Sequence, residues 1–408
     1  FPTHILRMAL DMYTAPRRSR CGAAVCRPVW TSMGVLAGCP IAMGALCLAV
    51  IEPMDILMRE VPKALTDIKV YVDDFTITHR VYGKQSPYNA AQQLAGIVER
   101  LHELIATVHL YCSVDKNQVL TNSLNYQQIV THALAQWKYQ PVETTKLLGV
   151  DYAGGKTIDY NHANQRLEKA KSATERMKVY DIKGVNITNA ARAHTAGATQ
   201  YGIMTTGMPT TILKEVTRTI RSTTSTIAQG GSATIDLLTQ RSRYMHPAYA
   251  AHLNLLMKWA TSIHQVIVDG EQKHHVLIES AKNTNKMKAA FNTQFEEVAN
   301  AQDPWKHVKG PTSAMIATLL RIRWFPADYD TWLTDDNEII DLKVVIPYMV
   351  SQKIKKAVER MLWENSTLKR HDSSTGRNQV PNLYIARKVI LGKDRLIGAM
   401  ARSVTIGT

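Results

Sequence analysis

Two adjacent aspartates interrupt a stretch of the sequence that otherwise has the composition of a β-strand. In "KVYVDDFTIT" (residues 69–78), Asp73 and Asp74 lie between Val72 and Phe75. Neighbouring carboxylates repel one another unless a cation neutralises them, so the interior of a strand has no use for such a pair. The pair therefore indicates a turn of the chain at this point, a site in which both carboxylates bind a cation, or both.

The residues before the pair alternate in polarity. Ile68, Val70 and Val72 fall on one face of a strand, and Tyr71 falls on the other. Aspartate is favoured in tight turns because its side chain bonds the local backbone. The pattern predicts a β-hairpin with the two aspartates at its turn. Aspartates in such a turn are either solvated residues without a function or a metal-binding pair at the end of a buried sheet.

The clearest predicted helix begins after Ser86, a good N-cap that precedes Pro87, a good first helical residue. Apolar residues then recur at a spacing of three and four, as on one face of an amphipathic helix. They are Leu94, Ile97, Val98, Leu101, Leu104, Ile105 and Val108. Strand patterns follow at 118–121 and, as a second hairpin, at 146–152.

Three shorter patterns precede the aspartates. They predict an amphipathic helix at 3–14, a strand at 23–30 and a helix from Pro40 to about Pro53. Strands, hairpins and helices mixed in this way predict an α+β fold, with helices packed on one face of a sheet.

From Asn161 onwards the sequence changes to helical patterns, with breaks at 229–232 and 303–311. Helices are expected at 312–324 and 346–365. A hairpin is expected between them, around the acidic "TDDNE", whose carboxylates we interpret as solvated. The chain is thus expected to divide into segments 1–155, 156–230, 231–310 and 311–408.

The charge of the chain points to a polyanionic partner. The 408 residues include 49 Lys and Arg against 34 Asp and Glu, giving a net charge of +15 and a pI of about 9.5. Basic side chains that neutralise phosphates release condensed counterions, which favours binding. Residues 351–408 contain 12 basic and 4 acidic residues and so hold more than half of the net charge. A basic end can also be a solvated tail.

Cysteine usage and hydropathy exclude other classes. The five cysteines form no C-x-x-C pair, which favours reduced thiols in the nucleus or cytoplasm over a disulfide framework or a zinc site. The uncharged stretch from Val29 to Ile51 is long enough to span a bilayer. Gly34, Gly38 and Pro40 interrupt its first half, so we expect a loop and a buried helix rather than a membrane span.

Three further blocks accompany the aspartates in a fixed order. With "YVDD" at 71–74, they are "GVLAGCPIA" (34–42), the 94–108 helix followed by "SVDKNQVLTNS" (113–123), and "KLLGVDY" (146–152). This series resembles reverse transcriptases, and most strongly the polymerases of non-LTR retrotransposons. The resemblance covers about residues 1–155, and more loosely residues 156 to about 230.

The resemblance implies a fold. Residues 1–155 would be a partial polymerase palm, an antiparallel sheet with helices on one face. Residues 156–230 would be a helical thumb-like region, residues 231–310 a helical connector, and residues 311–408 a basic C-terminal region of unknown role.

The resemblance also implies catalytic and metal-binding residues. Asp73 would be a metal ligand with Asp74 as its helper, and the site would use two Mg²⁺ ions, with Mn²⁺ as an alternative. Such ions activate a hydroxyl and stabilise the leaving group of an in-line phosphoryl transfer. The activity would be RNA-directed DNA polymerisation, in which a primer 3′-hydroxyl is extended on an RNA template with dNTPs.

Nucleotide and primer contacts are carried over in the same way. Gly38, Cys39, Pro40 and Lys116 would bind the incoming nucleotide. The primer and template would be contacted by Tyr71, by Leu148 and Gly149 of the second hairpin, and by thumb cations: Lys169, Lys171, Arg176, Arg218 and Arg221. Each of these residues can also be an ordinary strand aromatic, turn residue or surface charge.

The sequence departs from the family at several points. Met33-Gly34 and Ala37-Gly38 stand where the family usually has Arg-Gly and Gln-Gly. The family's first catalytic aspartate and its fingers have no counterpart, and Asp11 falls on the polar face of a predicted helix. We therefore expect a C-terminal fragment that is inactive alone, with an endonuclease domain possible upstream. A non-catalytic nucleic-acid-binding remnant and a maturase-like RNA-binding protein are the alternatives.

Overall fold

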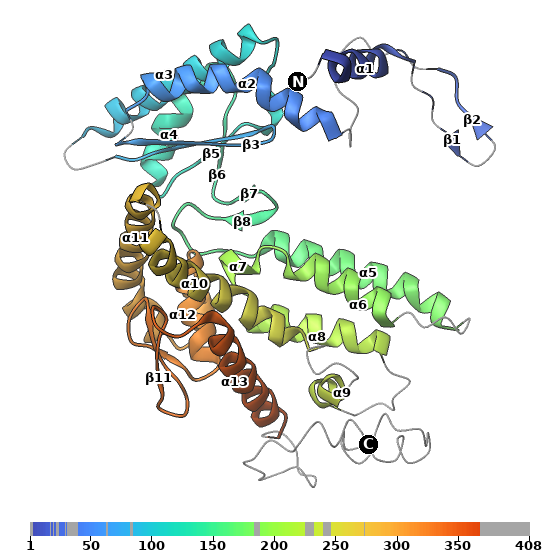
Figure 1. Cartoon of the computed structure of the whole chain (residues 1–408), viewed down its shortest axis with the longest axis vertical. Helices are drawn as coiled ribbons and strands as arrows, with labels where there is room; N and C mark the ends of the chain where they lie inside the picture. The colour runs from blue at the N-terminus through green and yellow to red at the C-terminus, as the bar shows by residue number, and fades with distance from the viewer. Residues whose placement is uncertain are drawn as a thin grey trace. The chain divides into compact units, whose positions relative to one another are not determined.

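The computed structural model of the chain describes residues 3–16, 18, 20–21, 24–28, 30, 40–62, 64–81, 85–182, 188–224, 232–239, 246–272 and 274–367. The fold is α+β as predicted, mostly helical with small sheets (Figure 1). It divides into two compact units, Phe1–Val142 and Glu143–Thr408. The division falls before residue 155, where the sequence suggested a boundary.

The first unit contains four helices and three small sheets among its described residues. The elements are α1 (Thr3–Thr14), β1 (Arg20–Cys21), β2 (Ala24–Val25), α2 (Pro40–Glu60), β3 (Thr66–Tyr71), β4 (Asp74–His79), α3 (Pro87–Thr107), a 3-10 turn (Val114–Lys116), β5 (Gln118–Leu120), α4 (Leu124–Ala133), a second 3-10 turn (Ala135–Trp137) and β6 (Gln140–Val142). β1–β2 and β3–β4 are antiparallel, and β5–β6 is parallel. Of the strand expected at 23–30, the structure shows β2 at Ala24–Val25, and residues 23 and 29 lie outside the described ranges.

Helix α2 begins at Pro40, as predicted, but does not end near Pro53. A proline inside a helix removes one backbone hydrogen bond and crowds the preceding turn. Here the residues beyond it, Met54, Leu57 and Val61, are buried in a cluster that includes the α3 side chains, and this burial continues the helix to Glu60. The prediction that α2 ends near Pro53 is therefore wrong, because it rested on the proline and not on the burial of the residues after it.

The predicted apolar stripe of α3 is buried on two sides. One side packs with α2 and the β3–β4 hairpin, and its buried residues are Ile97, Leu101, Leu104 and Ile105. The other side, with Ala91 and Val98, packs against Val119 of β5 and Val130 of α4. This helix therefore fixes the position of the hairpin that carries the aspartates.

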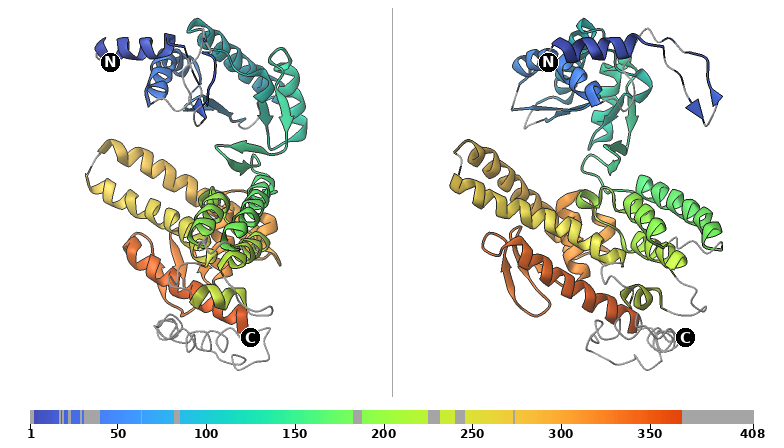
Figure 2. Two further views of the ribbon diagram at one scale, coloured as in Figure 1. Left: turned by 90° about the vertical axis from the view of Figure 1, so that its right-hand side faces the viewer. Right: turned by 45° about the vertical axis from the view of Figure 1, so that its right-hand side comes forward.

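The second unit is built from helices around a small antiparallel sheet. Its elements are β7 (Thr145–Leu147), β8 (Val150–Tyr152), α5 (Asn161–Ile182), α6 (Thr188–Gln200), α7 (Ile203–Thr206), α8 (Thr210–Thr224), α9 (Ala233–Thr239), α10 (Pro247–Gln272), α11 (His274–Ala299), a 3-10 turn (Pro304–His307), α12 (Pro311–Arg321), β9 (Phe325–Pro326), β10 (Thr331–Leu333), β11 (Ile339–Asp341) and α13 (Pro347–Thr367). α10 and α11 lie side by side as a helical hairpin (Figure 2).

One hydrophobic core runs through the second unit. It extends from Ala153 to Leu362 in sequence and includes residues of all three segments that were expected to follow residue 155. Trp332 of β10 and Trp324 before β9 are almost fully buried in it. The indole of Trp259 on α10 donates a 2.7 Å hydrogen bond to the carbonyl oxygen of Tyr329, which ties α10 to the sheet region. The core is therefore continuous across the breaks proposed at 230 and 310.

The "TDDNE" turn between β10 and β11 is less solvated than its sequence suggests. The carboxylate of Asp335 accepts hydrogen bonds from the Trp324 indole at 2.9 Å and from two nitrogens of Arg360 at 2.6 and 2.7 Å. Asp336 forms a further ion pair with Arg360 at 3.1 Å. These contacts join the hairpin to α13, so the interpretation of Asp335 as a solvated residue is wrong.

Within the described ranges, no helix is long and apolar enough to cross a membrane. Residues 29 and 31–39 of the uncharged Val29–Ile51 stretch lie outside those ranges. Residues 40–51 form the first half of α2. Met43, Leu48 and Ile51 are more than half exposed there, so the expectation of a buried helix is wrong for this half.

Two histidines are buried in the second unit. His246 accepts a 3.1 Å hydrogen bond from the backbone N–H of Ala248, and His252 bonds the carbonyl oxygen of the same residue at 2.6 Å through Nδ1. Their Nε2 atoms have no partner among the described residues. The pKa of each imidazole is lowered to about 3, for His246 by burial and for His252 by burial together with the nearby charge of Arg321.

This burial predicts that the second unit loses stability in mild acid. Because the unfolded chain binds protons near pH 6.5 and the folded chain does not, stability is full above that pH and falls below it. The expected loss is about 2 kcal/mol per histidine between pH 6.5 and pH 5. Urea unfolding at pH 7 and pH 5 measures it.

The matched variant is His252→Leu, which should show a smaller difference between the two pH values than the unchanged chain. An unchanged chain that is equally stable at pH 5 and pH 7 would contradict the prediction.

Candidate active site

The two aspartates lie at a tight turn, as predicted. In the β3–β4 ladder Tyr71 pairs with Asp74, so Val72 and Asp73 form a two-residue loop. Val72 has a φ of 58°, and Asp73 is not among the described residues with positive φ. A positive φ at only the first loop position is the type II′ pattern, which normally has glycine there.

Val72 is therefore a strained residue. A β-branched side chain crowds its own backbone in the left-handed region, and such a residue is a genuine outlier. Backbone strain of this kind is retained where the surrounding structure imposes it, and it is often found at functional sites. The strained residue immediately precedes Asp73, which makes this turn the first candidate for a site.

Both carboxylates face solvent. Asp73 and Asp74 are exposed, and Tyr71 beside them is 61% exposed. β3 and β4 form a two-stranded sheet, and no third strand joins them in the part of the chain that the structure describes. The larger buried sheet predicted from the sequence is thus absent from these ranges. The aspartates lie at the turn of a two-stranded hairpin that packs on α2 and α3.

The donor set of the turn suits a hard divalent cation only in part. Carboxylate oxygens are the ligands that Mg²⁺ prefers, with substrate phosphates and waters filling the remaining positions. Within the described ranges no third acidic, histidine or cysteine side chain joins the pair. The turn can therefore contribute two adjacent carboxylates to a metal site whose other ligands come from elsewhere.

The expected nucleotide pocket is described only in part. Gly38 and Cys39 lie outside the described residues, and Pro40 is described only as the first residue of α2. Lys116 ends the 3-10 turn after α3 and is exposed. It forms no ion pair with Asp73 or with any other described residue.

The second predicted hairpin is present in the second unit. β7 and β8 pair antiparallel through Leu147 and Val150, which leaves Leu148 and Gly149 as the two loop residues. Their φ angles are 49° and 81°, the type I′ pattern that is common in two-residue hairpins. The hairpin at 146–152 is thus confirmed.

Two residues that the sequence did not single out bind this hairpin tip. The hydroxyl of Tyr201 donates a 2.6 Å hydrogen bond to the carbonyl oxygen of Leu148. The guanidinium of Arg166 on α5 donates to the carbonyl oxygen of Gly149. Arg166 is one of many cations on a helix and Tyr201 one of 16 tyrosines, so neither carries a signal in the sequence.

The cations expected to contact nucleic acid divide into two groups. Lys169 and Arg176 of α5 are exposed and form no ion pair with described residues. Lys171 pairs with Glu168 at 2.9 Å and with Glu215 of α8 at 3.4 Å. Arg218 also pairs with Glu215, and Arg221 is half-buried. The first group is therefore the better placed for phosphate contacts.

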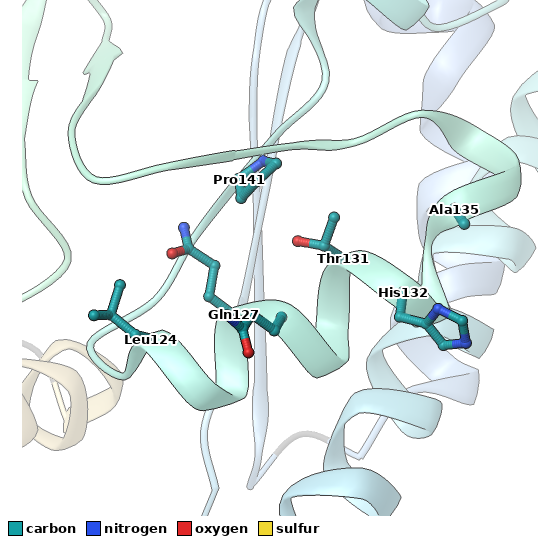
Figure 3. A pocket seen from close by; sticks show the side chains of 7 residues that line it. Leu124, Gln127, Thr131, His132, Ala135 and Pro141 are labelled. Carbon is teal, nitrogen blue, oxygen red and sulfur yellow. The ribbon is translucent and has the colours of Figure 1, made fainter.

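A surface pocket of about 540 Å³ lies between α4 and β6 in the first unit (Figure 3). The buried side chain of Gln127 extends from α4 toward Pro141, and its amide donates to the carbonyl oxygens of Val119 and Val142 at 3.0 and 2.7 Å. The lining is mostly apolar, with His132 its one titratable side chain. This pocket offers no group arrangement for catalysis.

Comparison with family models, with curated proteins and with solved structures gave no match to this chain.

The strain at Val72 leads to a stability prediction. Val72→Gly should leave the β3–β4 hairpin as stable as before or stabilise it by up to about 1 kcal/mol, because glycine accepts positive φ without steric cost. Hydrogen exchange of the backbone amides in β3 and β4 measures this change.

The matched control is Val70→Gly, in the extended part of β3, where glycine should destabilise the hairpin by about 0.5–1 kcal/mol. Equal destabilisation by the two variants would show that Val72 is not strained.

Proposed function

We propose that this chain is part of an RNA-directed DNA polymerase of the reverse transcriptase type, with Asp73 and Asp74 in its catalytic centre. One observation supports this most: a strained two-residue turn presents two adjacent, exposed carboxylates at the end of a hairpin. In a solvated turn without a function, a valine with positive φ only costs free energy. In a site that binds a ligand, the same backbone conformation can fix the orientation of the two carboxylates. The ordered sequence blocks around the turn support the same function.

In this proposal Asp73 and Asp74 would supply carboxylate oxygens that hold and orient Mg²⁺ ions. The ions would supply Lewis-acid stabilisation of the attacking and leaving oxygens. Tyr71, exposed beside the two aspartates, contacts the strand to be extended. The new bond joins the primer 3′-oxygen to the α-phosphorus of a dNTP, and the bond to pyrophosphate breaks.

The remaining parts take supporting roles in the proposal. The first unit corresponds to the palm, with the hairpin fixed by α3. The helices α5 to α8 correspond to a thumb, where Lys169 and Arg176 contact phosphates without reading sequence. The net charge of +15 favours an RNA template and a DNA primer as partners.

Replacing a metal-binding carboxylate tests the proposed activity. In the protein expressed with any coding sequence that precedes Phe1, Asp73→Asn should lower Mg²⁺-dependent dNTP incorporation on an RNA template by at least about a hundredfold. The amide keeps the size of the side chain but removes the charge that holds the ion. Primer extension with a labelled primer measures the rate.

The matched control is Asp67→Asn, on the same hairpin. Asp67 is exposed, and among the described residues its carboxylate forms an ion pair with Lys69 alone, at 3.5 Å. Such an exposed contact is worth little, so incorporation should be unchanged. Full activity of the Asp73 variant would refute the assignment of the catalytic centre.

A second candidate function is nucleic-acid binding without catalysis. It is favoured by the lack of a third metal-binding side chain near the pair among the described residues. It predicts salt-sensitive binding of RNA or duplex with no Mg²⁺-dependent incorporation. A maturase-like protein would in addition prefer one structured RNA, so equal competition by unrelated RNAs would exclude it.

A further inference from the structure

The tip of the β7–β8 hairpin has a backbone that needs support. Leu148, an ordinary residue with a bulky side chain, has a φ of 49°, and Gly149 follows with a φ of 81°. The left-handed region costs a non-glycine residue roughly 1–2 kcal/mol. A short hairpin on the surface does not by itself hold such a turn in one conformation.

Arg166 and Tyr201, which we call the tip clamp, occupy both carbonyl oxygens of this turn. Tyr201 donates its hydroxyl to the Leu148 oxygen at 2.6 Å, and Arg166 donates to the Gly149 oxygen. The two clamp residues are also joined, because Arg166 Nη2 donates to the Tyr201 carbonyl oxygen at 3.3 Å and its guanidinium carbon lies 5.8 Å from the centroid of the Tyr201 ring.

The Tyr201 ring of the clamp also packs closely against the backbone of the hairpin. A Cβ atom at Gly149 would lie 2.8 Å from Cε1 of Tyr201, so the ring lies directly against the turn. The next residue, Gly202, approaches Val150 of β8 in the same way, where a Cβ atom would lie 2.7 Å from Cγ2. The hairpin tip is therefore in contact both with the loop between α6 and α7, through Tyr201 and Gly202, and with α5, through Arg166.

The clamp limits which groups of the tip face a ligand. Protein donors already bind the carbonyl oxygens of Leu148 and Gly149, and no described residue outside the hairpin accepts from the backbone N–H groups of these two residues. The tip can therefore offer a ligand N–H donors and the 39% exposed Leu148 side chain. Phosphate and sugar oxygens of a nucleic-acid strand accept hydrogen bonds from such donors. The exposed ring of Tyr201, at 53%, adds an aromatic surface beside them.

We propose that Arg166 and Tyr201 are positioning residues, which hold the β7–β8 tip in the one conformation that receives the 3′ end of a primer strand. This inference rests on the proposed polymerase function and adds two residues that act through the tip rather than on the reacting atoms. Loss of either clamp residue frees a carbonyl oxygen, which repels phosphate and lets the turn relax.

The test compares two tyrosines on or beside the same hairpin. Tyr201→Phe removes only the hydroxyl that binds Leu148. Tyr152→Phe removes a hydroxyl on β8 that has no hydrogen-bond partner among the described residues, and Tyr152 is about as exposed, at 51%, as Tyr201. Each 408-residue chain is titrated with two fluorescent RNA–DNA duplexes of equal length, one with a recessed DNA 3′ end and one continuous and blunt.

The ratio of the two dissociation constants reports recognition of the primer end and does not depend on the fraction of folded protein. The unchanged chain and the Tyr152 variant should prefer the recessed end to the same extent. Tyr201→Phe should reduce that preference about five- to tenfold, as expected for one lost hydrogen bond. Arg166→Gln should reduce it at least as much, and Arg166→Lys, which keeps one donor, should restore part of it.

Two results would overturn the positioning role alone. One is a preference that is the same in the Tyr201 and Tyr152 variants or absent from the unchanged chain. The other is a Tyr201 variant whose dissociation constants for the two duplexes rise by the same factor, which is the behaviour of a purely structural residue. An unchanged chain that binds neither duplex, together with no incorporation in the primer-extension assay, would instead refute the polymerase function and with it the inference.

Discussion

The first unit depends on one helix that is apolar on two sides. α3 buries Leu101 and Ile105 in the cluster shared with α2 and the β3–β4 hairpin, and it buries Val98 against α4 and β5. A two-stranded hairpin is at best marginally stable alone, so its packing against these helices is what keeps its ladder formed. The strain at Val72 can persist only because the strands on either side of it are held in this way.

The sequence predicted the elements whose signals are local. The alternation before Asp73 and the three-and-four spacing of α3 each reflect burial of one face, and both elements are present where expected. The end of α2 was wrong because Pro53 is a local signal and the burial of Leu57 behind it is not. The solvated interpretation of Asp335 was wrong for the same reason, since its partner Arg360 lies 25 residues away.

In the candidate site, too, the sequence predicted the features with local signals and missed those that depend on other parts of the chain. The positions of Asp73, Asp74 and the 146–152 hairpin follow from short patterns of charge and hydrophobicity. The left-handed backbone of Val72 does not, because valine is a poor choice for that conformation and no propensity points to it. Tyr201 could not be found either, because it reaches Leu148 across 53 residues of sequence.

The close approach of the Tyr201 ring to Gly149 limits how this chain can change over time. Any side chain at 149 would meet the ring, and the left-handed backbone there disfavours every residue except glycine for a separate reason. Exchange of the tyrosine for a small residue would remove the steric contact with the ring and leave the unfavourable backbone conformation. Position 149 is thus constrained in two separate ways, and position 201 only through the contacts of its side chain with the hairpin tip, so in a diverging lineage the glycine should persist longer than the tyrosine.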